Sequence, residues 1–302
     1  MATDFGKTGA EYTPDVVSTG LIGKIAKQVL EAESIPYLFG SLDKGEIKTG
    51  KDLEVALIKA ATGVDPTADS PDFEKPEFLS RYFKEWTPKV FPAMIDYEDI
   101  DDGAISEENA TEQAAKIVDS LYQGASKFKN LGVVAALAAV QASVGTETPQ
   151  ILSVGALPEV SDEASANAFL SAVKKIAKKV RRGSPSVNVA GLDIPAERVV
   201  MITPSDNVTQ VDVYKRTATE QLEYARFDVD EVIEYDADKY STLNGATFIA
   251  DERYFQFFEK ARRYAERLRV GADNGNSVEA ALNVRFAFWI CALFNAAMIG
   301  QE

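Results

Sequence analysis

The chain has 302 residues, 46% of them hydrophobic, and it carries 47 acidic against 32 basic side chains, for a net charge of −15. It contains no histidine and a single cysteine, Cys291, which excludes His-based triads, His-ligated zinc and internal disulfides. The acidic balance opposes nucleic-acid binding over the surface as a whole. The absence of a leader-like start or a long apolar run predicts a protein that is neither exported nor embedded in a membrane.

The first third of the sequence contains little that can form a core. Residues 1–13 contain several small residues that interrupt regular structure and few apolar residues, so they are expected to form an arm without a core. Residues 14–35 have apolar positions at helical spacing, so this arm is expected to carry an amphipathic helix. Glycines and prolines then interrupt residues 36–82, leaving two strand-like pieces at 46–49 and 53–59. Such a long loop is unusual in a compact domain unless it reaches outward, which predicts an extended hairpin arm.

The middle of the chain alternates predicted strands and helices. Residues 84–97 read as a strand, and Ser106 is expected to cap a helix that breaks near 124–130 and resumes over 131–142. Ser161 should cap a second amphipathic helix, which Gly183 ends. The inward residues of that helix are expected to be Phe169, Val173, Ile176 and Val180, and further strands are predicted at 199–203, 231–235 and 246–250.

The end of the chain is expected to belong to the core. Residues 251–258 are predicted as a helix, and residues 263–272 as the first arm of a hairpin that turns at 273–276. The last nineteen residues, 284–302, are almost wholly apolar and predict one long buried strand locked into a central sheet. Cys291 lies within this run and is expected to be a buried thiol.

This order of elements resembles the major capsid proteins of tailed bacteriophages, the α+β Johnson fold. Two local sequences carry the resemblance, Ala196-Glu-Arg-Val-Val-Met-Ile-Thr-Pro204 and Phe248-Ile-Ala-Asp-Glu-Arg253. The resemblance implies an N-terminal arm and helix (1–35), an extended loop or E-loop (36–82), a peripheral domain with a spine helix (83–149), an axial domain (150–250) and peripheral return strands (251–302).

The resemblance also implies a function. Many copies, as pentamers and hexamers, would build an icosahedral capsid around double-stranded DNA without reading its sequence. Scaffolding and portal proteins would assist assembly in the host cytoplasm, and no membrane would be involved. Two alternatives stay open: the shell of an encapsulin-type nanocompartment, and an acidic α+β enzyme that uses carboxylate chemistry.

No catalytic, cofactor or metal residue is assigned from the sequence. The stretch Gly6-Lys-Thr8 lacks the earlier glycine of a phosphate loop, and the acidic cluster does not match a calcium loop. The basic run is expected to be a solvated helix face, with DNA or an acidic neighbouring subunit as open alternatives. The acidic cluster is Asp96, Glu98, Asp99, Asp101 and Asp102, and the basic run is Lys174, Lys175, Lys178, Lys179, Arg181 and Arg182.

Covalent cross-linking is left unassigned. In one branch of the resembled family, a loop lysine forms an isopeptide bond with an asparagine of another subunit, aided by a glutamate. Residues of these types occur here without an aligning motif, namely Lys44, Lys48, Lys51, Lys59, Asn274, Asn276 and Glu279.

Overall fold

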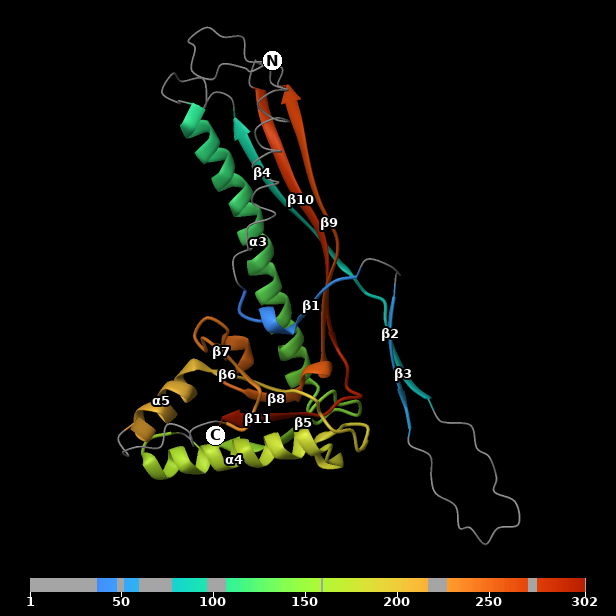
Figure 1. The fold of residues 1–302 in the computed structure, drawn as a ribbon, viewed down its shortest axis with the longest axis vertical. Helices are drawn as coiled ribbons and strands as arrows, with labels where there is room; N and C mark the ends of the chain where they lie inside the picture. The colour runs from blue at the N-terminus through green and yellow to red at the C-terminus, as the bar shows by residue number, and fades with distance from the viewer. Residues whose placement is uncertain are drawn as a thin grey trace, which may run out of the picture. The chain divides into compact units, whose positions relative to one another are not determined.

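The computed structural model describes residues 37–47, 52–59, 78–96, 107–158, 160–216, 227–270 and 276–301. Its contacts divide the chain into two compact units, whose elements are labelled in Figure 1. The predicted N-terminal arm and its helix lie outside the described residues, as does the acidic turn after Asp96. The first unit comprises the described parts of Met1–Lys48, Trp86–Ala138 and Phe257–Phe288, and the second those of Thr49–Glu85, Ala139–Gln256 and Trp289–Glu302.

A four-stranded sheet in the order β1-β9-β10-β4 forms the first unit. Its long strands β10 and β4 are antiparallel, with Phe286 opposite Thr87 at one end and Ser277 opposite Asp96 at the other. The short strand β1 runs parallel to β9 at the edge. The strands are β1 (Asp43–Glu46), β4 (Thr87–Asp96), β9 (Phe255–Val270) and β10 (Asn276–Ile290).

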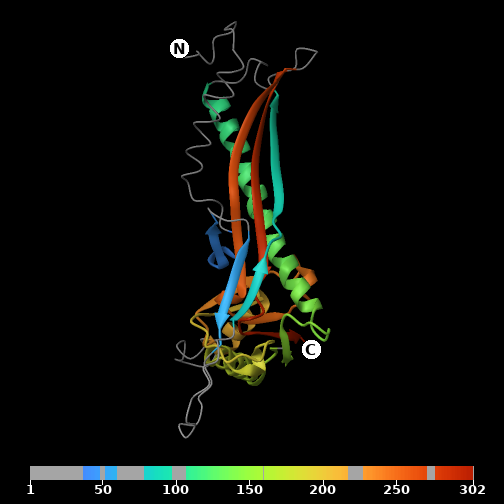
Figure 2. The same cartoon turned by 90° about the vertical axis from the view of Figure 1, so that its right-hand side faces the viewer.

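The long helix α3 (Glu107–Ala142) runs along this sheet, as Figure 2 shows. Side chains of β10 alternate between the two faces, so every second residue points toward the helix. These inward residues and one stripe of α3 form a continuous apolar core. The core comprises Val118, Leu121, Tyr122 and Ala125 of the helix and Ala280, Leu282, Val284 and Phe286 of the strand.

The predicted break in this helix at 124–130 is wrong, because α3 is continuous through it. Glycine favours a break by its conformational freedom, but here glycine allows close packing of aromatic rings. A Cβ on Gly132 would lie 2.2 Å from the Phe288 ring, and one on Gly124 would lie 3.1 Å from Phe91. The prediction that this region holds the longest helix is confirmed.

The described part of the predicted loop contains a two-stranded antiparallel hairpin, β2 (Leu53–Ile58) with β3 (Phe78–Phe83). The strand prediction at 53–59 is confirmed. Of the earlier piece, predicted at 46–49, only Glu46 is in a strand, as the last residue of β1 (Asp43–Glu46), and residues 48–49 lie outside the described residues. This strand pairs with β9 of the first unit and takes no part in the hairpin, because β2 finds its partner in β3.

A five-stranded sheet in the order β5-β11-β8-β6-β7 forms the second unit. Strands β6 and β8 are buried along their whole length and are antiparallel neighbours. Helix α4 packs on this sheet, with Phe169, Val173, Ile176 and Val180 buried as predicted. The elements are β5 (Leu152–Leu157), α4 (Glu163–Arg182), β6 (Val199–Pro204), α5 (Ser205–Arg216), β7 (Glu231–Tyr235), β8 (Thr247–Asp251) and β11 (Ala296–Gln301).

The ends of α4 differ in how well they were predicted. The N-cap is Asp162 rather than Ser161, because the Asp162 carboxylate accepts the backbone N–H of Ser165 and the two residues form a capping box. At the other end, Gly183 adopts φ +79° and closes the helix as predicted. A Cβ there would also lie 2.5 Å from the backbone of Ile194, so both the positive φ and the lack of space require glycine.

The C-terminal predictions need two corrections. Residues 251–258 are not a helix: they are the end of β8, the single 3-10 turn η5 (Glu252–Tyr254) and the start of β9, in keeping with the strand preference of their aromatic residues. The final run is not one strand either, since β10 ends at Ile290 and β11 begins at Ala296. The expectation that the chain ends inside a sheet is confirmed, because β11 lies between β5 and β8.

Candidate assembly surfaces

The β2–β3 hairpin exposes large apolar side chains. Directly opposed residues of antiparallel strands point to the same side, so Ile58 with Phe78 and Glu54 with Tyr82 share one face. Ile58, Phe78 and Tyr82 are 66%, 62% and 59% exposed. We call this surface the exposed hairpin face, comprising Glu54, Ala56, Ile58, Phe78, Ser80 and Tyr82. A two-stranded hairpin is only marginally stable alone, and an exposed apolar patch of this kind is typical of a surface that binds another protein.

One end of the hairpin is held within the second unit. The Phe83 ring stacks on the Trp289 indole, with centroids 5.4 Å apart. The Trp289 Nε1–H also donates to the Glu85 carbonyl oxygen at 2.9 Å. The end of β3 is therefore fixed by an aromatic contact and a hydrogen bond.

A second apolar surface lies on the side of the first sheet that faces away from α3. Val90 and Met94 of β4 are 56% and 53% exposed there. A hollow of about 590 Å³ adjoins them, and the small side chains of Ala265 and Ala281 help to line it together with Glu279. We call this surface the outward sheet face, comprising Val90, Pro92, Met94, Ala265, Glu279 and Ala281.

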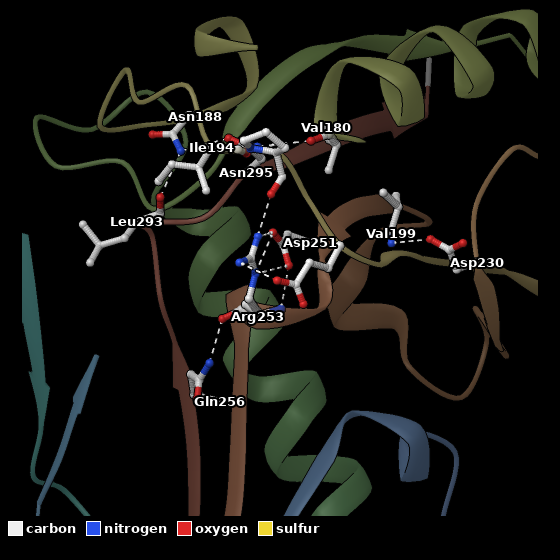
Figure 3. A network of polar contacts seen from close by, with 12 residues as sticks. Val180, Asn188, Ile194, Val199, Asp230, Asp251, Arg253, Gln256, Leu293 and Asn295 are labelled. Atoms are coloured by element: carbon white, nitrogen blue, oxygen red, sulfur yellow. Dashed lines mark hydrogen bonds and ion pairs between the residues drawn. The ribbon is translucent and has the colours of Figure 1, made fainter. Parts of the chain in front are cut away.

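A buried polar network holds the turn between β10 and β11 (Figure 3). The Asn295 amide donates to the Val180 carbonyl oxygen at 3.1 Å and to that of Ile194, and its own oxygen accepts from Asn188 at 2.9 Å. The Asn295 carbonyl oxygen accepts the Asp251 N–H at 2.9 Å. The Asn295 side chain therefore ties this turn to the end of α4 and the loop after it, and its backbone carbonyl ties the turn to β8.

Arg253 extends this network. Its guanidinium forms an ion pair with the buried Asp251 carboxylate at 2.8 Å and donates to the Pro195 carbonyl oxygen at 2.7 Å. It also lies 4.8 Å from the centroid of the Phe294 ring. The two sequence stretches that carried the family resemblance meet here, since β6 and β8 pair from Val199 opposite Asp251 onward.

A partly buried ionic cluster lies in the first unit. The Lys129 amine of α3 forms ion pairs with Asp43 of β1, at 2.9 Å, and with Glu259 of β9. Arg262 lies 3.5 Å from Glu259, and the Lys129 amine is 4.8 Å from the centroid of the Tyr37 ring. We call these five residues the Lys129 cluster. Sequence reasoning missed it, because residues 43, 129 and 259 are far apart in the chain.

The basic run occupies one side of α4, and none of its six side chains is buried. Lys178 pairs with Asp228 at 3.9 Å and Arg181 pairs with Asp230 at 3.1 Å. These pairs agree with the predicted solvated face. Whether DNA or a neighbouring subunit also contacts the run stays a prediction.

The described residues show little that is typical of a catalytic or metal-binding site. Within them, no cluster of Cys, Asp and Glu is arranged to hold a metal ion. Of the predicted acidic cluster only Asp96 falls in a described element, at the end of β4.

No described helix is both long and apolar enough to cross a membrane. Cys291 is fully buried as predicted, and burial raises the pKa of its thiol, which disfavours the reactive thiolate.

The cross-linking candidates are scattered among the described elements. Lys44 lies in β1, Lys59 follows β2, and Asn276 and Glu279 lie in β10. Lys48, Lys51 and Asn274 lie outside the described residues. Their covalent linkage stays unassigned.

The fold is that of phage capsid proteins. A chain in the capsid structure of Staphylococcus phage Andhra matches with a TM-score of 0.64 and 12% identity, covering 89% of this chain and 85% of that one. A chain in the structure of the head fiber and inner core protein of native bacteriophage P68 matches with a TM-score of 0.63 and 12% identity, covering 89% and 86%. A chain of the mature capsid of bacteriophage PhiM1 has a TM-score of 0.54 and 10% identity, covering 90% and 89%.

Sequence comparison places the chain more narrowly. Residues 2–299 match the model of a family described as Phi29-like phage major capsid protein. The chain belongs to this family, which confirms the resemblance and the predicted α+β fold. It is a structural protein of the virion capsid, which assembles from many copies, rather than an enzyme, and the nanocompartment alternative is not favoured. No curated protein matches the chain in sequence.

Proposed function

We propose that the subunit builds its shell through the β2–β3 hairpin, which packs on a neighbouring copy. In this assignment residues 36–82 are the extended loop, 83–149 and the strands from 251 onward form the peripheral domain with α3 as its spine helix, and 150–250 form the axial domain. Residues 1–35 are the N-terminal arm. The two observed units support this division, with the amendment that β11 completes the axial sheet.

The exposed hairpin face is the observation that carries the proposal. Ile58 and Phe78 are directly opposed and both largely exposed, so together they present a continuous apolar patch. Burying such a pair stabilises an interface by about 1.5 to 3 kcal/mol for each side chain. Nothing in the described part of the hairpin's own subunit covers this patch.

The outward sheet face of the neighbouring copy is the proposed receiving surface. Its exposed Val90 and Met94 match the hairpin in polarity, and alanines leave a hollow that a large side chain can enter. Repetition of this contact from copy to copy is head-to-tail. Such contacts close into rings when the rotation permits, which suits pentamers and hexamers.

The shell is proposed to enclose double-stranded DNA without sequence-specific contacts. The net charge of −15 supports this, because an acidic container binds packaged DNA weakly and lets it enter and leave. Scaffolding and portal partners and assembly in the host cytoplasm are proposed from the family resemblance. Nuclease treatment of purified particles tests the DNA proposal: protected DNA supports it, and particles that never protect DNA contradict it.

A double variant tests the role of the hairpin. Ile58→Ser together with Phe78→Ser should leave a folded subunit but weaken each hairpin contact by about a hundredfold or more. The matched control is Ala56→Ser, which changes a small residue on the same face. Light scattering and electron microscopy should show shells for the control and unassembled subunits for the double variant. Normal shells from the double variant would contradict the proposal, and an unfolded double variant by circular dichroism would place these side chains in the subunit core.

A further inference from the structure

The Lys129 cluster has the composition and geometry of a site for amide-bond formation. The Lys129 amine and the Asp43 carboxylate are 2.9 Å apart, and their side chains are only 12% and 16% exposed. Leu42 precedes Asp43 in the chain and Phe257 is its partner in the pairing register, and both are almost fully buried. Burial lowers the pKa of the Lys129 amine, which increases its neutral, nucleophilic fraction.

The two oxygens of Asp43 occupy different positions. Oδ1 accepts the Gly45 backbone N–H at 2.8 Å, whereas Oδ2 faces the Lys129 amine. Tyr37 also hydrogen-bonds to this carboxyl group. Burial is the main cause that raises the pKa of the Tyr37 phenol, and the charge of Asp43 adds to it. Tyr37 therefore keeps its proton and donates it in this hydrogen bond. A backbone N–H aimed at a carboxyl oxygen stabilises the negative charge that develops there when a nucleophile attacks the carbon.

Glu259 is the third component. It contacts the same amine, and its side chain is 12% exposed. Arg262 lies 3.5 Å away on the same strand and places a second positive charge beside Glu259. Asp43 and Glu259 both contact the Lys129 amine, and a carboxylate bound to the same amine as the acid can take protons from the nitrogen and return them to the leaving oxygen. Asp43 is the acceptor rather than Glu259, because the Gly45 backbone N–H is bonded to the Asp43 oxygen that would remain, and within the described residues no backbone N–H is bonded to Glu259 in this way.

We propose that Lys129 and Asp43 become joined by an amide bond within each subunit, with Glu259 as the proton carrier. The Lys129 nitrogen attacks the Asp43 carboxyl carbon, a C–N bond forms, and the bond from that carbon to Oδ2 breaks. The ammonium form of lysine begins with three protons; one stays on the amide nitrogen, and Glu259 passes two to Oδ2, which leaves as water. Oδ1 becomes the amide oxygen, and Glu259 ends in its starting state. No oxidant or other reactant is needed.

Such a bond would reinforce a weak point of the fold. Strand β1 has four residues, lies at a sheet edge, and pairs with β9 in an irregular register. It also lies just before the hairpin in the chain, so a pull on the hairpin by a neighbouring copy acts on β1. A covalent link to α3 holds β1 in place under that load. This pair is internal to one subunit and uses none of the seven cross-linking candidates named from the sequence.

Mass spectrometry of the full-length protein, before and after shell assembly, tests the proposal. The intact mass is expected to be lower than the sequence mass by one water molecule. Trypsin does not cleave after an acylated lysine, so digestion should yield one branched peptide that joins residues 28–44 to residues 128–174. Fragmentation must place the branch at Asp43 and Lys129. Unbranched peptides at full yield from assembled shells would overturn the proposal, as would a branch at Glu259.

Three controls separate the bond from an ordinary ion pair. Lys129→Arg keeps the positive charge and should show the full sequence mass. Glu259→Gln should slow branching by about a hundredfold or more, which a time course after purification would show. The exposed pair Lys178 and Asp228 serves as an internal control and should give no branched peptide. Branching in Glu259→Gln at the wild-type rate would overturn the role given to Glu259.

Discussion

The β2–β3 hairpin and the five-stranded sheet show two ways of using apolar strands. In the sheet, β6 and β8 are buried at every position, so the apolar residues hold the subunit together. In the hairpin, Ile58 and Phe78 lie largely in solvent, so the same kinds of side chain contribute little within the subunit. The difference teaches that apolar content alone does not mark a core. In the proposed function, the hairpin residues stabilise a contact between copies.

A matched pair of phenylalanine substitutions should separate the two roles most strongly. Phe248→Ala removes a fully buried ring from β8 and should cost about 3 to 5 kcal/mol of unfolding free energy. Phe78→Ala removes an exposed ring and should change that free energy by about 0.5 kcal/mol or less, while reducing shell yield. Denaturant unfolding measures the first quantity and particle counts the second. Equal losses of unfolding free energy in Phe248→Ala and Phe78→Ala would contradict the distinction between core and interface residues.

The Asn295 network should come next in size. Asn295→Ala leaves the Val180 and Ile194 carbonyls without their side-chain donor and removes one of the two acceptors of the Asn188 amide, which should cost about 2 to 4 kcal/mol. Asn283→Ala, on the outward side of β10, is the control and should be near neutral. Chemical denaturation of both variants gives the comparison. A loss for Asn295→Ala no larger than that of the control would show that the network does not hold the sheet.

Packing of α3 on the first sheet predicts a smaller effect. Gly132→Ala would place a methyl group into the Phe288 ring and should cost about 1 to 3 kcal/mol, although alanine normally favours a helix. Gly124→Ala meets Phe91 at a wider distance and should be tolerated better. Adding Phe288→Leu should recover part of the loss from Gly132→Ala. Thermal unfolding of the three variants measures this, and a stabilised Gly132→Ala would contradict the close packing.

The smallest predicted effect concerns the N-cap of α4. The pKa of the Asp162 carboxyl is lowered, mainly because its carboxylate accepts a hydrogen bond from the backbone N–H of Ser165. A group with a lowered folded pKa adds stability that is complete above its unfolded pKa and is lost as pH falls through the folded value. Wild-type stability should therefore fall slightly more between neutral and strongly acidic pH than that of Asp162→Ala. Parallel stability curves for the two proteins would contradict this.

The sequence predicted elements best where local signals agreed with tertiary packing. The strands at 199–203 and 231–235 and the inward stripe of α4 were found because periodicity and turn residues pointed the same way. Residues 251–258 failed because their aromatic spacing also fits a helix, and only pairing in the two sheets selects the strand. Strand β5 gave a weaker signal and was not predicted, and helix α5 lies between the strands at 199–203 and 231–235, where the sequence indicated only helical or irregular pieces.

The candidate surfaces were only partly predictable. The glycines and prolines of 36–82 indicated an outward hairpin, but the register that places Ile58 opposite Phe78 depends on pairing across a long gap in sequence. Asn295 offered one signal, a polar residue within an apolar run, which indicates a buried hydrogen-bonding role. The Lys129 cluster offered none, since its members come from separate elements that only the folded sheet and α3 bring together.

The most direct test of the whole account is the size and form of the assembled wild-type protein. Analytical ultracentrifugation, followed by electron microscopy of the fast-sedimenting fraction, should show closed shells of many copies, or pentamers and hexamers as their precursors. The exposed hairpin face and the outward sheet face predict this, because their large apolar side chains, such as Phe78 and Met94, lie largely in solvent in the isolated subunit. A protein that stays monomeric or dimeric under all assembly conditions would contradict the account.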